Sequence, residues 1–399
     1  MLKLCILFWR LGPYHHARLR AAGQQGQVTA VELTGIDDTY AWDTIDGADS
    51  FQRETLFSES GDSPKQIAEI RRRIFAALDR IQPDVVAIPG WSFPDALAAL
   101  AWSIQAGKPT VLMSESQARD HRRNRLKESV KRRIVQLNSA GLVGGASHVD
   151  YLCDLGMQRD QIFTGYDVVD NDHFRNGAAA ARANSPEVRC RLGLPERYFL
   201  ASNRFIEKKN LPRLLNAFAM YRNHCGADAW DLVLLGDGPQ RAALEQRVDE
   251  LGLRDHVIFP GFQQYDTLPS YYGLAGAFVH ASTTEQWGLV VNEAMAAGLP
   301  VIVSENCGCA SDLVATGGNG FTFAPNDEVR LADLMKQLAT ENQVRSDMGS
   351  SSEEIIARWS PRTFADGIWQ AAEKAASLPP RKASLLDQTI LWQVRGKAA

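Results

Sequence analysis

The chain has 399 residues, of which 45% are hydrophobic and 23% are charged, and its formal net charge at pH 7 is −4. This length exceeds that of one ordinary core, so we expect about two domains with the composition of a soluble globular protein. The slightly acidic balance gives no case for a nucleic-acid partner. No apolar run approaches the ~20 residues that a membrane-spanning helix needs.

The cysteines are scattered along the chain, and a chain of this length does not need disulfides to fold. We therefore expect reduced thiols in a cytosolic protein. Cys307 and Cys309 are separated by one residue, without the CxxC spacing or neighbouring histidines of a metal or redox site, so a tight loop is favoured. The opening MLKLCILFW lacks a cleavage site for a signal peptide and predicts a first strand.

A strand–loop–helix unit is predicted at the start of the chain. Residues 2–9 form the strand, and the helix is expected from residue 17. The loop between them holds four candidate acceptor-side residues: Gly12, Tyr14, His15 and His16. In open parallel sheets ligands bind beyond the carboxyl ends of strands, so this loop should face a ligand. Neighbours on a helix point in different directions, so one histidine is expected to be solvated only.

The next segments alternate between strand and helix patterns. Strands are expected at 28–34, 84–88 and 109–113, and helices at 63–81 and 94–105, which predicts a parallel, doubly wound sheet. The connection at 35–62 is long and acidic. It is predicted to be either a lid on the acceptor side or a variable surface loop.

A basic stretch covers residues 119–133. Eight Lys and Arg residues stand there against Asp120 and Glu128, and apolar residues recur at helical spacing. One interpretation is a peripheral contact with an anionic membrane, in which each cation contributes on the order of 1 kcal/mol. The other is a solvated helix face, because the apolar stripe lacks Trp and Phe.

The middle of the chain predicts a domain boundary. Residues 175–195 are rich in Ala, Asn, Gly and Pro and lack strand periodicity, so we expect domains at 1–180 and 196–361. The sequence Asp170-Asn171-Asp172 spells DxD, a metal-binding pattern, but three such residues occur readily by chance. We expect no metal site.

The second half opens with a strand at 198–202 and a loop that carries Arg204 and Lys209. Cations in such a loop suit a pyrophosphate that leaves with extra negative charge. Gly236 begins a tight turn after the strand 231–235, and no P-loop is present. Phe262 ends a further strand. His280 lies inside the next strand and is interpreted as a core or edge histidine.

Residues 276–304 predict a strand, a loop, a helix at 288–297 and a second strand. Ser282, Thr283 and Thr284 are expected to cap the helix. The first turn around Gly288, Leu289 and Val290 leaves backbone N–H groups for an anion. Glu285 in the loop and Glu293 on the helix add carboxylates. Together these groups favour a nucleotide sugar over two merely solvated glutamates.

This segment, with Trp287-Gly288 and the run Asn292-Glu293-Ala294-Met295-Ala296, resembles the donor-site signature of retaining family 4 glycosyltransferases of GT-B fold. The loop 203–210 resembles the Gly-Arg…Glu-Lys-Gly loop of the family, with Asn203 and Asn210 in place of glycines. Residues 166–174 resemble the Asn-Gly-Val-Asp…Phe segment of the family loosely. The resemblance is specific from 199 to about 325 and only architectural from 1 to 174.

The resemblance implies an α/β protein with two doubly wound, Rossmann-like domains that face a central cleft. The N-terminal, acceptor-side domain would be completed by a helix at 362–378 that crosses back, and 196–361 would bind the donor. The implied enzyme transfers a sugar from a nucleoside diphosphate to a hydroxyl of a glycan, a lipid-linked glycan or a small molecule, and keeps the anomeric configuration. It would use no metal or cofactor and would prefer a UDP-sugar to a GDP-sugar. We expect a cytoplasmic location, and whether the protein also contacts the inner face of the membrane through 119–133 stays open.

The resemblance also implies roles for the site residues. Arg204, Lys209 and the N–H groups of 288–290 would stabilise the leaving diphosphate. Glu285 would hold hydroxyls of the donor sugar and support the cationic ring, and Glu293 would bind the ribose. Gly236 and Phe262 would lie near the nucleotide.

One departure concerns the first domain. Many family members place a histidine after the strand that corresponds to 109–113, whereas this chain has Ser114-Glu115-Ser116. Which N-terminal side chain touches the donor sugar therefore stays open. Two other functions also stay open: a nucleotide-sugar epimerase of the same fold, and a non-catalytic protein that binds nucleotide sugars.

Overall fold

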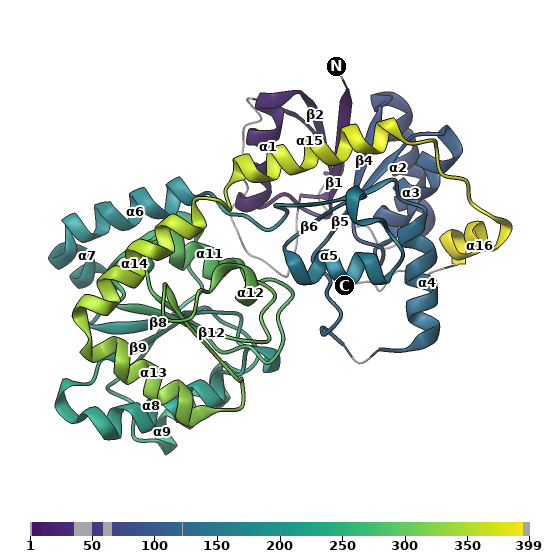
Figure 1. Cartoon of the computed structure of the whole chain (residues 1–399). Coiled ribbons are helices and arrows are strands. Elements are labelled where there is room, and N and C mark those ends of the chain that lie inside the picture. The colour runs from purple at the N-terminus through teal and green to yellow at the C-terminus, as the bar shows by residue number, and fades with distance from the viewer. Residues whose placement is uncertain (1, 36–49, 59–65, 122, 394–399) are drawn as a thin grey trace. The chain divides into compact units, whose positions relative to one another are not determined.

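The structure is a computed structural model that describes the chain except for residues 1, 36–49, 59–65, 122 and 394–399 (Figure 1). The chain folds into two compact units. The first unit comprises residues 1–168 and 360–399, and the second comprises 169–359.

The boundary therefore lies at Val168, and not near residue 180 as we expected. The segment interpreted as a linker forms two helices of the second unit, α6 (Asn171–Ala183) and α7 (Ser185–Leu192). Alanine is the best helix former, and Phe174 and Ala178 of α6 are fully buried. Gly177 lets α6 approach α10 (Leu268–Leu274), because a Cβ atom at Gly177 would lie 2.5 Å from the Pro269 side chain.

The first unit contains a parallel sheet of seven strands in the order β3-β2-β1-β4-β5-β6-β7. Its strands are β1 (Lys3–Phe8), β2 (Gln27–Thr34), β3 (Gln52–Phe57), β4 (Val85–Pro89), β5 (Thr110–Ser114), β6 (Ala140–Val143) and β7 (Ile162–Thr164). The helices of the unit are α1 (Pro13–Gln25), α2 (Ile67–Ile81), α3 (Pro94–Ala106), α4 (Arg125–Gln136), α5 (Ala146–Asp154), α15 (Pro361–Ser377) and α16 (Leu385–Gln393).

The central strands of this sheet read as continuous apolar runs because helices cover both of their faces. Residues 4–8 of β1 and 85–88 of β4 are buried. Helix α15 returns from the end of the chain to this unit, where Trp369 donates a hydrogen bond of 2.9 Å from Nε1 to the carbonyl oxygen of Ala22. The tail after α15 continues to α16, and Asp387 of α16 forms an ion pair of 2.8 Å with Arg133 of α4.

Part of the long acidic connection is a strand. β3 pairs with β2 at the edge of the sheet and carries Glu54. The other acidic residues of 35–62, and the predicted start of a helix at Ser63-Pro64, lie outside the described residues. β3 was missed because its sequence QRETLF has few apolar residues, and its edge position leaves much of it half-buried.

The second unit contains a parallel sheet of six strands in the order β10-β9-β8-β11-β12-β13. Its strands are β8 (Tyr198–Ser202), β9 (Asp231–Leu235), β10 (Val257–Gly261), β11 (Ala277–His280), β12 (Val301–Ser304) and β13 (Gly320–Phe323). Besides α6, α7 and α10, its helices are α8 (Leu211–Cys225), α9 (Arg241–Glu250), α11 (Leu289–Ala296), α12 (Ala310–Leu313), α13 (Glu328–Thr340) and α14 (Asn342–Ile356).

Within the part of the chain that the structure describes, no helix is both long and apolar enough to cross a membrane. The basic stretch 119–133 corresponds mainly to α4, which begins after Asn124. The side chain of Asn124 accepts hydrogen bonds from the N–H groups of Leu126 and Lys127. Several cations of this stretch have internal partners: Lys131 pairs with Glu128 at 3.0 Å, and Arg132 donates to the carbonyl oxygen of Asp154 at 2.7 Å.

Candidate functional site

The two sheets share one topological feature that locates a ligand site. In each sheet the strand order reverses beside the first strand of the unit: between β1 and β4 in the first, and between β8 and β11 in the second. In open α/β sheets ligands bind beyond the carboxyl ends of the strands at this point. A ligand site is therefore expected at the loops after β1 and β4 in the first unit, and at the loops after β8 and β11 in the second.

In the second unit the loops after β8 and β11 bring a carboxylate and two lysines together. Glu285 forms ion pairs with Lys208, at 3.1 Å, and with Lys209. His280, at the end of β11, lies beside them with its Nε2 atom 3.8 Å from Glu285 Oε2. Glu285 and Lys209 are nearly buried, with side-chain exposures of 12% and 13%. The structure thus joins two of the predicted residues and adds Lys208 and His280.

The charges of this cluster fix its protonation state. Burial opposes ionisation of Glu285, but the hydrogen bond with His280 and the positive charges of Lys209 and Lys208 outweigh it, so the pKa of Glu285 lies well below its ordinary range. Burial lowers the pKa of His280, against the raising effect of Glu285. Glu285 is therefore a carboxylate that only accepts hydrogen bonds, and His280 is neutral at physiological pH.

Arg204 lies in the same loop as Lys209, and its side chain is exposed. The loop is held by Asn210, which has a left-handed backbone conformation with φ of 59°. Its side-chain amide donates to the carbonyl oxygens of Ala281, at 3.0 Å, and Pro325, at 2.7 Å. Asn210 can replace the glycine of the family pattern because Asn tolerates this conformation and its amide adds these bonds.

Gly236 and Gly288 allow close approaches of the backbone around this cluster. A Cβ atom at Gly236 would lie 1.9 Å from the carbonyl oxygen of Asn203, and Gly236 has φ of +119°. Gly288, with φ of +106°, lies against Glu285 and His280, and a Cβ atom there would be 3.6 Å from each side chain. Both positions therefore need glycine for conformation, and Gly236 needs it also for space.

Helix α11 begins directly after Gly288. Gly288 is its N-cap and forms no side-chain cap, so Ser282, Thr283 and Thr284 do not cap the helix as expected. They lie too far upstream, and Ser282 instead contacts His280 Nε2 at 3.2 Å. Among the described residues the backbone N–H groups of 288–290 form no backbone hydrogen bond, so the first turn of α11 has the donors that the prediction of an anion site requires.

Glu293 is buried on α11, with an exposure of 1%. Tyr272 of α10 donates a hydrogen bond of 2.5 Å from its hydroxyl to Glu293 Oε2. Burial and the Glu293 carboxylate both raise the pKa of Tyr272, and a hydrogen bond with Ser202 at the end of β8 opposes the rise. Tyr272 therefore links Glu293 to the end of β8, a link that sequence reasoning missed. Phe262, after β10, has 40% of its surface exposed.

The first unit has a different arrangement at its own reversal point. Helix α1 begins at Pro13, so Tyr14, His15 and His16 lie on its first turn and not in a loop. Proline is favoured at the first helical position, which moves the start of the helix to Pro13. His15 Nδ1 accepts a hydrogen bond of 3.1 Å from the N–H group of Gly12, and the His15 ring lies tilted against Phe8 with centroids 4.5 Å apart. Burial, and secondarily Arg18, lower the pKa of His15 to about 3.

His15 therefore serves the helix start, and it is neutral across the physiological range. His16 faces elsewhere, with its ring 5.5 Å from that of Phe51.

Two aromatic side chains lie together where the loops after β1 and β4 meet. The rings of Trp9 and Phe93 have centroids 5.9 Å apart, and 38% of Phe93 is exposed. The loop after β1 is fixed by Glu32, which is fully buried and accepts a hydrogen bond of 3.0 Å from the N–H group of Leu11. Arg53 and Thr55 of the edge strand also bind Glu32, at 2.7 Å and 2.6 Å. None of these residues was singled out from the sequence.

Buried acids accompany this edge of the first sheet. Glu115, which follows β5 where many family members have histidine, forms a hydrogen bond with Asp167. Burial first and then Glu115 raise the pKa of the fully buried Asp167 well above its ordinary value. Burial also raises the pKa of Asp95, on the first turn of α3, to about 6. The two units therefore offer different chemistry: carboxyl groups and aromatic rings in the first, and lysines with a helix start in the second.

Two residues of the DxD pattern form hydrogen bonds that fix the start of α6. Asp170 is the N-cap of α6 and accepts from the N–H group of His173 at 3.2 Å, and Asn171 donates to the carbonyl oxygen of Ile356 at 2.9 Å. Within the described part of the chain no group of three or more His, Cys, Asp or Glu residues is arranged to hold a metal ion. Cys307 and Cys309 are buried cysteines in the tight loop after β12.

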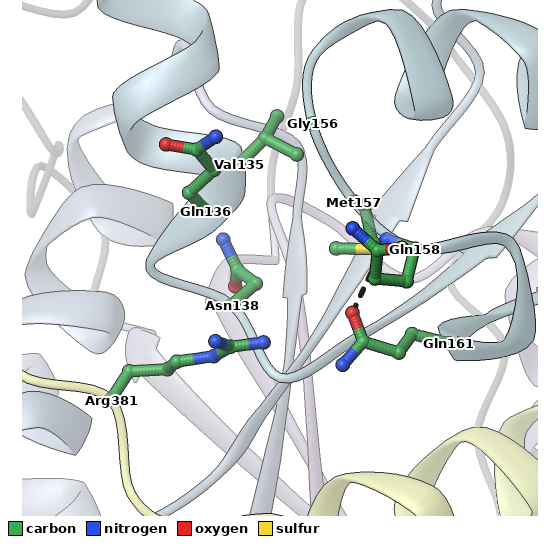
Figure 2. Close-up of a pocket in the computed structure, with 8 residues that line it drawn as sticks. All are labelled: Val135, Gln136, Asn138, Gly156, Met157, Gln158, Gln161 and Arg381. Carbon is green, nitrogen blue, oxygen red and sulfur yellow. Dashed lines mark hydrogen bonds between the residues drawn. The ribbon is translucent and has the colours of Figure 1, made fainter.

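A pocket of about 360 Å³ in the first unit holds none of the predicted site residues (Figure 2). It is lined by Asn138, which precedes β6, and by Gln158 and Gln161, which precede β7, with Arg381 of the tail opposite. It therefore lies at the amino ends of the strands, away from the edge that carries Glu115.

The chain is similar to known proteins in sequence and in fold. Residues 188–355 match the family model of glycosyl transferases group 1. The chain is 32% identical, over 206 residues, to a GDP-mannose-dependent alpha-(1-6)-phosphatidylinositol monomannoside mannosyltransferase of Mycobacterium tuberculosis, covering 49% of this chain and 52% of the relative. It is 36% identical over 176 residues to an alpha-monoglucosyldiacylglycerol synthase of Streptococcus pneumoniae, covering 44% and 39%. The chain thus spans about half the length of the curated relatives it matches.

Solved structures match over nearly the whole chain. The Anabaena protein HepE in complex with UDP has a TM-score of 0.71 at 19% identity, covering 94% of this chain and 100% of that chain. A glycosyltransferase from Rickettsia africae has a TM-score of 0.71 at 11% identity, covering 94% and 98%. At such low identity these matches show the fold alone, and they confirm the expected GT-B class with its two parallel sheets. The similarity to glycosyl transferases group 1 therefore covers residues 188–355 in sequence, and the rest of the chain is matched by fold alone.

Proposed function

We propose that this protein is a retaining glycosyltransferase that moves a sugar from a nucleoside-diphosphate sugar to a hydroxyl of a glycan, a lipid-linked glycan or a small molecule, without a metal. The observation that carries the proposal is the cluster of Glu285, Lys208, Lys209 and His280 at the reversal point of the second sheet, next to the uncapped start of α11.

Each part of this cluster suits one part of such a donor. A diphosphate placed against Lys209, Arg204 and the N–H groups of 288–290 would meet cations and donors that are already fixed. These groups would stabilise the negative charge that develops as the diphosphate leaves. Fixed cations could perform the task that a divalent metal performs elsewhere. Glu285, held ionised by its neighbours, would accept hydrogen bonds from sugar hydroxyls and oppose the positive charge of the ring.

The nucleoside would lie along the remaining strand ends of the second unit. Glu293 would accept from the ribose, with Tyr272 fixing its carboxylate, and Phe262 would present an exposed ring near the base. We propose a UDP-sugar as the donor, in line with the UDP complex of HepE. Because a relative is named as GDP-mannose-dependent, GDP-mannose must be tested beside it.

The acceptor would be recognised by the first unit. The Trp9 and Phe93 rings offer apolar faces of the kind that stack on sugar rings, at the reversal point of that sheet. Glu115, which is half-buried, adds a carboxyl group for acceptor hydroxyls. By their names, one relative is a phosphatidylinositol monomannoside mannosyltransferase and another makes a monoglucosyldiacylglycerol, which supports a lipid-linked acceptor as one class to test. A membrane contact through 119–133 remains a proposal of ours.

The proposal is tested by a thermal-shift screen of the full chain with UDP, GDP, ADP and their sugar conjugates, in the presence of EDTA. Ligand at about 100 times Kd should add roughly 2.7 kcal/mol of stability. Lys209→Gln and Glu293→Gln should reduce the shift, and Arg254→Gln, an exposed arginine of the same unit, should not. The proposed donor site is wrong if no nucleotide stabilises the folded wild-type protein.

Turnover separates transfer from the alternatives. Release of nucleotide that depends on an added glycan acceptor would exclude an epimerase, which transfers nothing. NMR of the product would give the anomeric configuration, and an inverted product would refute the retaining mechanism. If the folded protein binds the donor but releases no nucleotide with any of the acceptors tested, a non-catalytic binding protein is favoured.

A further inference from the structure

A second pocket, of about 580 Å³, lies in the second unit at the edge opposite Glu285. Its wall includes Arg197, which precedes β8, and residues that precede β11 and β12, so it is at the amino ends of the strands. Nothing in the proposed reaction uses this edge. The pocket is notable for its charge, since four arginines line it: Arg182, Arg189, Arg197 and Arg345.

Two carboxylates, Glu196 and Glu353, line the same pocket, so four positive and two negative side chains leave a formal charge of +2. Among the described residues, none of these four arginines forms an ion pair of 4.0 Å or less with an Asp or Glu side chain. Arginine side chains gathered in a concave surface without a paired acid are an electrostatic site for anions.

Two of the arginines donate hydrogen bonds to backbone carbonyl groups of the second unit. Arg182 donates to the carbonyl oxygen of Gly273 at 3.0 Å and to that of Ala297, and so fastens the ends of α10 and α11. Arg189 donates to Leu274 at 3.0 Å and to Pro195. Their positive charge is partly offset by these carbonyl groups at the negative ends of helices. The charge available to a ligand is therefore mainly that of the other two.

Arg197 and Arg345 form the open side of the pocket. Arg197 is exposed and Arg345 is half-buried, with its guanidinium carbon 4.8 Å over the ring of Trp230. Arg345 donates one hydrogen bond, of 3.0 Å, to the carbonyl oxygen of Leu338. Burial, and then the neighbouring charge of Arg197, lower the pKa of Arg345. The two guanidinium groups therefore repel each other, and a bound anion would remove that repulsion.

The start of α14 adds hydrogen-bond donors on the same wall (Figure 1 shows α14 in the second unit). Asn342, Arg345, Ser346 and Ser350 line the pocket at helical spacing, so they lie on one face of the helix. The N-cap of α14, Glu341, makes no side-chain cap hydrogen bond. Asn342, the first residue of this helix of 15 residues, and Ser346 one turn later therefore place a side-chain amide and a hydroxyl on the same side as the arginines.

We propose that this pocket is a binding site for a small polyanion that carries at least two phosphate or carboxylate groups. One anionic group would be held by Arg197 and Arg345, because each guanidinium group can donate two N–H hydrogen bonds to two oxygens of one phosphate or carboxylate. The other would be held by the hydroxyl of Ser346 and the amide of Asn342. The inference does not rest on the proposed transferase activity, because the pocket and the Glu285 cluster are at opposite edges of the sheet.

The probes are inorganic pyrophosphate and citrate, titrated separately into the full chain at low salt by calorimetry. The variant is Arg197→Gln/Arg345→Gln, and the matched control is Arg213→Gln/Arg254→Gln, which removes two exposed arginines of the same unit outside the pocket. Because pyrophosphate also suits the donor site, each titration is repeated with hydrogen–deuterium exchange, which reports where protection occurs. Lys209→Gln serves as the variant of the donor site.

We expect at least one anion to protect residues 342–346, and the pocket variant to weaken that binding roughly tenfold or more, since two charged hydrogen-bonding groups are removed. The control and Lys209→Gln should leave this protection unchanged. If only pyrophosphate binds, the pocket selects phosphate groups. If citrate binds as well, the pocket also accepts carboxylate groups.

The inference is overturned if neither anion protects 342–346, if protection is confined to 203–210 and 288–290, or if the pocket variant binds as the control does. Loss of the transferase function would leave this result unchanged. Thermal unfolding of both double variants establishes that they are folded before binding is compared.

Discussion

Lys209 and Glu285 are 76 residues apart in the sequence, yet their side chains form a nearly buried ion pair that joins the loops after β8 and β11. These two strands are neighbours in the sheet because the chain reverses its strand order between them. The pair therefore places a cation and a carboxylate at the one edge of the second unit where a ligand is expected.

Lys209→Gln should weaken the binding of the nucleotide diphosphate roughly tenfold, because it removes a fixed cation from the diphosphate position. Lys208→Gln is the matched control. Lys208 also pairs with Glu285, but its side chain is 41% exposed, so solvent screens its charge and a smaller loss is expected. Calorimetric titration with UDP and GDP measures both losses. Equal losses would mean that burial does not distinguish the two lysines.

Glu32→Gln should lower the free energy of unfolding by about 3 kcal/mol. The substitution removes the negative charge of the fully buried Glu32, so Arg53 loses its ion-pair partner. The loop after β1 should loosen too, since Leu11 donates to the same carboxylate. Glu54→Gln on the same edge strand is the control. Its ion pair with Arg80 is exposed, so a change below about 1 kcal/mol is expected. Urea unfolding compares the two, and similar changes would contradict the role given to Glu32.

Gly236→Ala should disrupt the loop 203–210, because the new Cβ atom would overlap the carbonyl oxygen of Asn203 and the backbone has φ of +119°. Both a loss of stability of about 2 kcal/mol or more and a loss of nucleotide binding are expected. Gly252→Ala has a positive φ of +67° but no atom within 4 Å of its Cβ position. This control should lose about 1 kcal/mol and keep its binding. Retained binding in Gly236→Ala would show that the loop adapts.

The low pKa of His15 predicts a pH dependence of stability. The folded pKa is about 3 and the ordinary value is 6.5, so between these values the unfolded chain binds a proton that the folded chain does not. The free energy of unfolding of the wild type should therefore fall, relative to that of His15→Gln, as the pH is lowered from 6.5 towards 3. The difference between the two proteins should be constant above pH 6.5.

Urea unfolding at pH 7.5, 6 and 5 would measure this difference. His280, whose pKa is also lowered, contributes equally to both proteins and cancels. Parallel curves below pH 6.5 would mean that His15 titrates as it does in the unfolded chain.

The local parts of the site followed from the sequence alone. Apolar runs bounded by glycine and proline identified the central strands, and the order of strand and helix patterns required parallel sheets. The start of α11 beside Glu285, and the loop with Arg204 and Lys209, were found because their elements are short and their residues are close together in the sequence. The start of α1 was expected four residues too late, at residue 17, because Pro13 defines it. The start of α11 was expected within one residue of its position, but Gly288 is its N-cap and the hydroxyl residues upstream do not cap it.

Only the tertiary structure decided which distant residues meet. No local pattern distinguishes Glu32 from a solvated glutamate, yet it is buried beneath Arg53, Thr55 and Leu11. His280 was interpreted as a core or edge histidine, and the approach of the β8 loop places Lys208 and Lys209 in the cluster that it forms with Glu285. The division of the chain at Val168 likewise depends on the packing of α6 against α10, which composition cannot reveal. Sequence periodicity reports burial along one element, whereas the partners of a buried charge are chosen by the order of strands in the sheet.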